Sequence, residues 1–321
     1  MFSVYASKPN FDDPLASLVV GERPDPEVRE GWVRVNITAA SLNWHDLLTL
    51  RGVGLKPEGY PMILGCDGAG TLEDGTEGVI YPVMGDPDWR GDETLDPKRN
   101  VLTEKYQGTF ADYVVVPRRN IVPRPQGLSA VSASLLGTAW LTAYRMLFTK
   151  SGLRPGQTML VQGASGGVST ALIQLGCAAG MQVWVTGRTK EKRALAERLG
   201  AHKTFESGED LPQRVDAVFD NIGEATWKHS MRSVRRGGII VCSGRTSGDN
   251  PGADLLRLIV EQITVVGSVM GTLHELCNLI DFVASNGITP QIGQVLPMDR
   301  AEDGFRAMWE GRTAGKIIFT R

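Results

Sequence analysis

A glycine-rich run in the middle of the chain has the residue types and spacing of a turn that binds a diphosphate. The run follows an apolar stretch at residues 158–161 and precedes a helix-like stretch at residues 170–179. Glycines let the backbone approach an anion closely, and the free N–H groups at a helix N-terminus attract negative charge. Residues 181–186 have the pattern of a second buried strand, which completes a βαβ unit. The sequence therefore predicts a dinucleotide site, with contacts from Gly163, Ala164, Ser165, Gly166, Gly167 and Val168.

The residues after that second strand favour a dinucleotide with a 2′-phosphate. An NAD site usually has an acidic residue about 20 positions on, which binds the ribose 2′-hydroxyl. No carboxylate ends the strand here, and Arg188, Thr189 and Lys192 are expected to face a 2′-phosphate instead. Two charge-assisted hydrogen bonds of about 1.5–3 kcal/mol each would favour NADPH by roughly ten- to a few hundred-fold after desolvation costs. The alternative is an ordinary solvated helix face, but we expect NADP(H).

The composition is that of a globular protein of about two domains. The 321 residues are 42% hydrophobic and 22% charged, and 34 basic and 36 acidic residues leave a formal net charge of −2. This balance favours neither a nucleic acid nor a membrane as partner, and we find no apolar run long enough to span a bilayer and no signal pattern. The cysteines form no CxxC pair, which favours a reducing, cytoplasmic environment for Cys66, Cys177, Cys242 and Cys277.

Two kinds of pattern divide the chain. Strand-like alternation and turns dominate residues 1–127, in which residues 84–106 are rich in Gly, Asp and Pro and predict a surface loop. A long helix is expected at residues 129–150, with Ser129 as its N-cap. Residues 158–271 alternate between strand- and helix-like stretches, as in a parallel sheet, and further elements are expected at residues 215–220, 238–242, 263–268, 275–285 and 316–320.

Taken together, these motifs resemble the medium-chain dehydrogenase/reductase superfamily over essentially the whole chain. The matching stretches are residues 40–46, 63–70, 163–168, 220–223, 266–272 and 315–319. The resemblance is closest to the zinc-free quinone oxidoreductase and enone reductase branch. It implies a mixed α/β fold, in which residues 1–127 and 272–321 form a GroES-like, mainly β catalytic domain. Residues 128–271 would form a doubly wound, parallel-sheet Rossmann domain, with the cofactor in the cleft between the two.

Further cofactor contacts are expected where the strands of the Rossmann domain end. Ligands of doubly wound sheets lie at the carboxyl ends of the strands, which predicts contacts from Asn221, Ser243, Gly244, Ser268 and Met270. The resemblance adds Thr142, which matches a threonine that contacts the nicotinamide, with Thr138 beside it. Relatives commonly pair through the strand at Ile263 to Met270, which implies a homodimer with one continuous sheet.

Metal ligands are the part of the family pattern that this chain lacks. In zinc-dependent relatives the catalytic ion is bound by a Cys, a His with an adjacent Glu, and a later Cys or Asp. The matching positions hold Asn43, Cys66 with Asp67, and Thr138, and amides and hydroxyls are poor zinc ligands. Cys66 and Asp67, with His45 as a third, remain the residues that could bind a metal, but we expect none. Residues 84–106, where relatives carry a structural zinc lobe, contain no cysteine.

Without a Lewis acid, the expected substrate is a quinone or an α,β-unsaturated carbonyl, because conjugation spreads the charge that hydride transfer creates. The resemblance places Asn43 against the nicotinamide ribose or the substrate carbonyl. His45 and Tyr60 are candidate proton donors, with capping or packing as alternatives, and the other histidines (His202, His229 and His274) are expected at the surface. Two other functions stay open: an alcohol or aldehyde dehydrogenase with an atypical metal site, and an NADPH-binding sensor or structural protein with little turnover.

Overall fold

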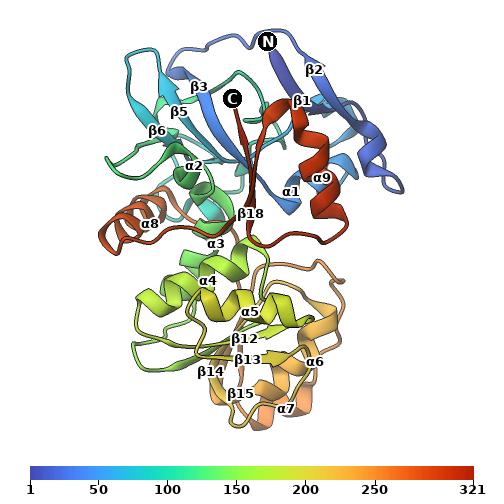
Figure 1. Ribbon diagram of the computed structural model, residues 1–321, viewed down its shortest axis with the longest axis vertical. Coiled ribbons are helices and arrows are strands. Elements are labelled where there is room, and N and C mark those ends of the chain that lie inside the picture. The colour runs from blue at the N-terminus through green and yellow to red at the C-terminus, as the bar shows by residue number, and fades with distance from the viewer. The chain divides into compact units, whose positions relative to one another are not determined.

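The computed structural model describes residues 1–321, and the chain divides into two compact units (Figure 1). The first unit comprises Met1–Leu141 and Gly271–Arg321, and the second comprises Thr142–Met270. The sequence placed the first division at 127/128, before the long helical stretch. In the structure the residues up to 141 stay with the first unit, because helix α2 (Ala130–Ala133) packs against two strands of that unit's sheet.

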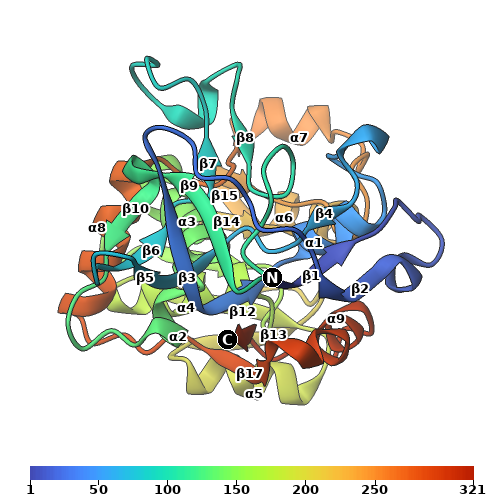
Figure 2. The same ribbon diagram turned by 90° about the horizontal axis from the view of Figure 1, so that it is seen from above.

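Mostly antiparallel strands make up the first unit (Figure 2). One seven-stranded sheet has the order β10-β6-β5-β3-β18-β17, with β9 also paired to β3, and a three-stranded sheet has the order β2-β1-β4. The strands are β1 (Phe2–Ala6), β2 (Leu18–Glu22), β3 (Trp32–Leu42), β4 (Met62–Ile63), β5 (Gly68–Leu72), β6 (Glu77–Ile80), β9 (Tyr113–Pro117), β10 (Ile121–Pro123), β17 (Ile292–Pro297) and β18 (Lys316–Thr320).

The pairing of β3 with β18 brings distant parts of the sequence together. Strand β18 runs antiparallel to β3, and Ile317 lies opposite Leu42. Asn43 follows as the N-cap of α1 (Trp44–Leu50), so Lys316 at the start of β18 lies beside it. Phenylalanines from three segments pack nearby, and the remaining helices of the unit are α8 (Leu273–Ser285) and α9 (Ala301–Trp309). The predicted last strand, residues 316–320, is confirmed.

The long helical stretch is helical but irregular. Ser129 caps it as predicted, since its hydroxyl accepts a hydrogen bond from the Ser132 backbone N–H at 3.1 Å. Beyond α2, two π-helical segments (Leu136–Trp140 and Arg145–Lys150) flank α3 (Leu141–Tyr144). No helix in the chain combines the length and apolar character needed to cross a membrane.

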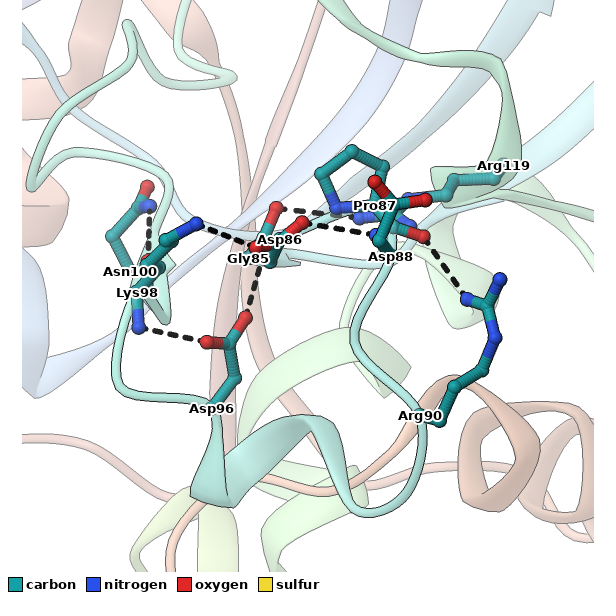
Figure 3. Close-up of polar contacts among 9 residues, drawn as sticks. All are labelled: Gly85, Asp86, Pro87, Asp88, Arg90, Asp96, Lys98, Asn100 and Arg119. Atoms are coloured by element: carbon teal, nitrogen blue, oxygen red, sulfur yellow. Dashed lines mark hydrogen bonds and ion pairs between the residues drawn. The ribbon is translucent and has the colours of Figure 1, made fainter.

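Residues 84–106 form an ordered lobe, so the prediction of a surface loop is wrong in part. Two short strands, β7 (Val83–Met84) and β8 (Asn100–Val101), pair there. Figure 3 shows the polar contacts that hold the segment between them: the Asp96 carboxylate accepts the backbone N–H groups of Asp86 and Lys98 at 2.6 and 2.7 Å. Asp96 is buried, and these backbone groups satisfy its carboxylate. The sequence predicted an exposed turn because aspartates in Gly- and Pro-rich stretches are typical of turns.

The second unit is a parallel α/β domain. Its six strands have the order β13-β12-β11-β14-β15-β16, which is the doubly wound order of a dinucleotide-binding sheet. The predicted strands are confirmed with small shifts at their ends. The elements are β11 (Thr158–Val161), α4 (Gly167–Ala178), β12 (Gln182–Gly187), α5 (Lys190–Arg198), β13 (Lys203–Glu206), β14 (Val215–Asp220), α6 (Glu224–Ser233), β15 (Val234–Cys242), α7 (Leu255–Val260) and β16 (Thr264–Gly267).

Candidate functional site

The glycine turn lies between β11 and α4 in the second unit. Gly163 has φ +84°, a conformation that side chains rarely adopt, and a Cβ there would lie 3.2 Å from the Ile222 side chain. Gly166 is the N-cap of α4 and offers no side chain to bind the first N–H groups of the helix. The turn Gly163–Val168 is therefore closely packed on one side, and its helix N-terminus has the free N–H groups that an anion needs.

Basic side chains gather where β12 ends. Thr189 is the N-cap of α5 and accepts the Lys192 backbone N–H at 3.3 Å, so Arg188 and Lys192 project from adjoining positions. Partial burial and the nearby positive charge of Arg188 lower the pKa of Lys192. Arg193, by contrast, donates to the Gly187 carbonyl and pairs with Glu206 at 3.0 Å, which makes it a structural residue. Glu191 lies between them in the sequence, but its carboxylate interacts with the Thr189 side chain at the N-terminus of α5. The positive charges of Arg188 and Lys192 favour an anionic ligand.

Two of the predicted strand-end residues have buried hydroxyl groups with no partner in the chain. Cys242 of β15 pairs with Gly267 of β16, so Ser243 and Ser268, the next residues, also lie side by side. The Oγ atoms of both serines are buried and make no hydrogen bond. A buried polar group without a partner is costly, so these hydroxyls are suited to a ligand that supplies one. The donor set thus fits a nicotinamide dinucleotide.

The remaining strand-end residues shape the same edge of the sheet. A Cβ on Gly244 would collide with the carbonyl oxygen of Asn221, so the loops after β14 and β15 touch there only because of a glycine. Met270 has φ +46° and a buried side chain. Thr142 is also buried in the second unit. Thr138 belongs to the first unit, where its hydroxyl lies 3.4 Å from Cys66 Sγ.

A buried polar cluster in the first unit surrounds Asn43. The Asn43 side-chain nitrogen donates to the Ser41 carbonyl at 3.1 Å and to Asp67 Oδ1 at 3.0 Å, and it lies 3.5 Å from Cys66 Sγ. The Asn43 side-chain oxygen accepts a 2.6 Å hydrogen bond from Lys316 Nζ, which also donates to the Leu42 carbonyl at 2.6 Å. Both amide protons of Asn43 therefore have acceptors within the protein, and its oxygen is bound by the Lys316 amino group.

Lys316 was not among the residues that the sequence predicted for the site. A lysine at the first position of an apolar strand is ordinarily expected to be exposed, so this position did not stand out. The structure buries its side chain almost completely (3% exposed), near the Asp67 carboxylate. Burial lowers the pKa of Lys316, and the charge of Asp67 opposes that shift.

Burial also changes the acids of this cluster. It raises the pKa of the Cys66 thiol well above the usual range, and the nearby Asp46 and Asp67 carboxylates add to the shift. It raises the pKa of Asp67, which Lys316 and the Ser41 hydroxyl lower again. Asp46 accepts the backbone N–H groups of Asn43 and Gly65 at 2.9 and 2.8 Å, but burial still raises its pKa to about 7. Neutral forms are thus favoured for the acids of the cluster.

The two predicted proton donors differ in what they contact. His45 Nε2 is buried and makes no hydrogen bond, and burial lowers the pKa of this histidine. The Tyr60 hydroxyl donates to the Thr49 carbonyl, and partial burial raises its pKa. His45 is therefore the predicted catalytic residue whose polar atom still lacks a partner.

Comparison with known proteins places this geometry in a family. Residues 29–126 match the model of the alcohol dehydrogenase GroES-like domain, and residues 167–285 match that of the zinc-binding dehydrogenase domain. A crystal structure of an NAD-dependent alcohol dehydrogenase is 30% identical over the full length of both chains, with a TM-score of 0.92. The chain belongs to the medium-chain dehydrogenase/reductase superfamily. It is accordingly an oxidoreductase with a GroES-like and a Rossmann-type domain, in a family that uses nicotinamide cofactors.

Several relatives in this superfamily have names that describe reductions. An acryloyl-coenzyme A reductase of Metallosphaera sedula is 27% identical, over 94% of this chain and 96% of its own. A 2-methylene-furan-3-one reductase of Solanum lycopersicum is 29% identical, over 91% of this chain and 72% of its own. A zinc-type alcohol dehydrogenase-like protein of Schizosaccharomyces pombe is 27% identical, over 91% of each chain.

The residues at the zinc-ligand positions of the superfamily do not fit a metal ion here. No group of three His, Cys, Asp or Glu side chains in this chain is placed to bind one. Asn43 directs its N–H groups, rather than its oxygen, toward Asp67 and Cys66, because Lys316 binds the oxygen. Zinc binds a thiolate, and burial raises the pKa of the Cys66 thiol, which opposes that form.

Proposed function

We propose that this protein is an NADPH-dependent reductase that transfers a hydride to a quinone or an α,β-unsaturated carbonyl without zinc. One observation carries the proposal. The Lys316 amino group donates to the oxygen of Asn43, at a place where zinc-dependent members of the superfamily need electron-pair donors. The Asn43 oxygen is thus already bound within the cluster that would otherwise hold the metal.

The second unit would bind the cofactor, which supplies the hydride when it is bound. The turn Gly163–Val168 would bind the diphosphate with backbone N–H groups. Arg188 and Lys192, with the Thr189 hydroxyl, would bind the 2′-phosphate, and the unpaired hydroxyls of Ser243 and Ser268 would bind the nicotinamide half.

The first unit would supply a hydrogen bond to the acceptor. In an enone or quinone the negative charge spreads over a conjugated system, so a single neutral donor stabilises it more readily than the localised charge that forms on a simple ketone. We assign this donor to His45, because its Nε2 has no partner in the protein. Asn43 would hold the cluster in place, since its amide protons bind Ser41 and Asp67, and the Tyr60 hydroxyl would serve only after it leaves Thr49.

The names of relatives support reduction of conjugated carbonyls, since acryloyl thioesters and methylene-furanones both carry a C=C bond next to a C=O bond. Relatives named alcohol dehydrogenases, such as one of Geobacillus stearothermophilus that is 26% identical, favour the second candidate, an alcohol or aldehyde dehydrogenase. The hydrogen bonds around Asn43, in which Lys316 binds the amide oxygen, favour the reductase over the dehydrogenase.

Acceptor preference tests the proposal. The purified protein is mixed with NADPH and, in separate assays, a small quinone, an enone and the saturated ketone of the same carbon skeleton, and NADPH absorbance is followed. We expect consumption with the quinone or the enone and little with the saturated ketone. Faster turnover of the saturated ketone, or of an alcohol with NADP⁺, would overturn the proposal in favour of the second candidate.

We also propose a homodimer through the edge of the second unit's sheet. Strand β16 is an edge strand, and the neighbouring helix α7 exposes apolar side chains, among them Leu256 at 76% and Ile259 at 68%. An exposed edge and an apolar face are both covered if two copies pair along residues 263–270. Light scattering should give the mass of two chains, and Ile259→Asp should lower it toward one. A wild-type mass of one chain would contradict this assembly.

A further inference from the structure

A chain of hydrogen bonds runs under the glycine turn, and its order determines the tautomer of a buried histidine. His229 on α6 was expected at the surface, but its side chain is buried, with 5% of the residue exposed. Its Nε2 lies 2.7 Å from the Glu209 carbonyl oxygen, which can only accept, so Nε2 carries the proton. His229 Nδ1 then accepts a hydrogen bond from the Gln162 side-chain nitrogen at 2.9 Å.

From Gln162 the chain continues to the turn itself. The Gln162 side-chain oxygen accepts from the Thr186 hydroxyl at 2.8 Å, and the Thr186 oxygen accepts the backbone N–H of Gly163 at 3.2 Å. Thr186 lies in β12, two residues before Arg188. Hydrogen bonds that all donate in the same direction therefore connect α6, the glycine turn and the end of β12.

A branch of the same network reaches the loop after β14. The Gln162 side-chain nitrogen also donates to the Ser230 hydroxyl at 3.0 Å, and that hydroxyl donates to Asp220 Oδ2 at 2.6 Å. Asp220 Oδ1 accepts the backbone N–H groups of Ile222 and Gly223 at 3.0 Å each. Three of the loops expected to contact the dinucleotide are thus tied to one glutamine.

We propose that His229, acting through Gln162, is a positioning residue for the dinucleotide site, and that it must be neutral for the site to keep its geometry. This inference rests on the proposed dinucleotide site. A protonated imidazole would present an N–H at Nδ1 to the N–H of Gln162. Gln162 could relieve that contact only by turning its amide, which would break its bonds with Thr186 and Ser230.

The surroundings of His229 favour the neutral form. Burial lowers its pKa, and Arg232 on the same helix lowers it further. The hydrogen bond to the Glu209 carbonyl acts in the opposite direction, as do the charges of Asp210, in the loop before β14, and Asp220, at the end of β14. Because the pKa of His229 is depressed, the neutral form predominates at neutral pH, and the geometry is lost as the pH falls through the lowered value.

Dinucleotide binding tests this role. NADPH affinity is measured by fluorescence between about pH 8 and about pH 5.5 for wild type, His229→Leu and His229→Asn. We expect His229→Leu to bind about tenfold more weakly at neutral pH, because Gln162 loses its acceptor. His229→Asn, which keeps an acceptor near the Nδ1 position but carries no charge, should bind nearly as wild type at neutral pH. Its NADPH affinity should also fall much less than that of wild type as the pH decreases.

A control variant and the behaviour of wild type separate a failure of the His229 inference from a failure of the proposed function. His202→Asn is the matched control, because His202 also accepts a backbone N–H through Nδ1, from Val183 at the other end of the strands, and should change nothing. Equal affinity of wild type and His229→Leu, or an unchanged acid weakening in His229→Asn, would overturn the inference alone. If wild type itself binds neither NADPH nor NADH, the proposed function fails first. If His229→Leu does not fold, the pH profiles of wild type and His229→Asn decide.

Discussion

The two units each contain a buried polar network, and the two networks differ in their titratable groups. The network around Asn43 contains a buried lysine, Lys316, whose pKa burial lowers, and buried acids whose pKa values burial raises. The network around Gln162 centres on neutral groups that donate in one direction, with a single carboxylate, Asp220, that accepts at its far end. Both hold loops that are expected to carry function, but through different physics.

This difference sets how each network should fail. Removing the Lys316 amino group leaves two buried oxygen atoms without a donor at once, which is costly even if the fold survives. Breaking a neutral chain costs about one hydrogen bond at a time and changes geometry before stability. The pH dependences are also opposite: acids with raised pKa lose stability as the pH rises, and a histidine with a lowered pKa loses it as the pH falls.

The largest effect should follow from Lys316→Met. The Leu42 carbonyl and the Asn43 oxygen would lose their donor, and each buried acceptor left without a partner costs about 1–3 kcal/mol, so we expect a loss of about 2–5 kcal/mol in the free energy of unfolding. Denaturant unfolding measures this. Lys98→Met is the control, since Lys98 pairs with Asp86 on the surface with a side chain 75% exposed, where solvent screens the pair, and the variant should keep nearly the wild-type stability. Equal stabilities of the two variants would remove the distinction between the networks.

The pH dependence of stability should isolate Asp46. Its pKa is about 7 in the fold, against 3.8 ordinarily, so the folded protein holds a proton that the unfolded chain releases over that range. The free energy of unfolding should therefore fall as the pH rises from about 4 to about 7, by roughly 2–4 kcal/mol from this group. Asp46→Asn has no such proton to lose, and its unfolding profile should be flatter. Parallel profiles of the two proteins would contradict this assignment.

Arg188→Asp should change cofactor choice without changing the fold. The variant places a carboxylate where a 2′-phosphate is expected, so the preference for NADPH over NADH should fall by roughly ten- to a few hundred-fold. The ratio of the two dissociation constants is the measurement. Arg198→Asp, on the exposed face at the other end of α5, is the control and should leave the ratio nearly as it is. An unchanged ratio in Arg188→Asp would exclude this arginine from the site.

Local patterns predicted the second unit well, because its elements are set by short segments of sequence. The glycine turn, the strand at residues 215–220 and the serines at the ends of β15 and β16 all follow from apolar runs and their boundaries. Long-range pairing lay beyond such patterns. His229 contacts Gln162 across 67 positions, and Lys316 contacts Asn43 across 273. A lone histidine and a lone lysine carry no sign of such partners in the sequence.

At residues 84–106 the sequence pattern predicted a surface loop, whereas the structure has a compact lobe. Its Gly, Asp and Pro content describes a loop, but the aspartates are used to bind backbone N–H groups inside a compact segment. Composition predicts exposure only when polar side chains find their partners in water.

The central claim, a reductase that works without zinc, is tested most directly by metal content and turnover in one sample. The protein is dialysed against EDTA, its zinc is measured, and NADPH consumption with an enone or a quinone is followed before and after zinc is added. We expect less than one zinc per several chains and turnover that zinc does not increase. Stoichiometric zinc that survives dialysis, or turnover that appears only after zinc is restored, would contradict it.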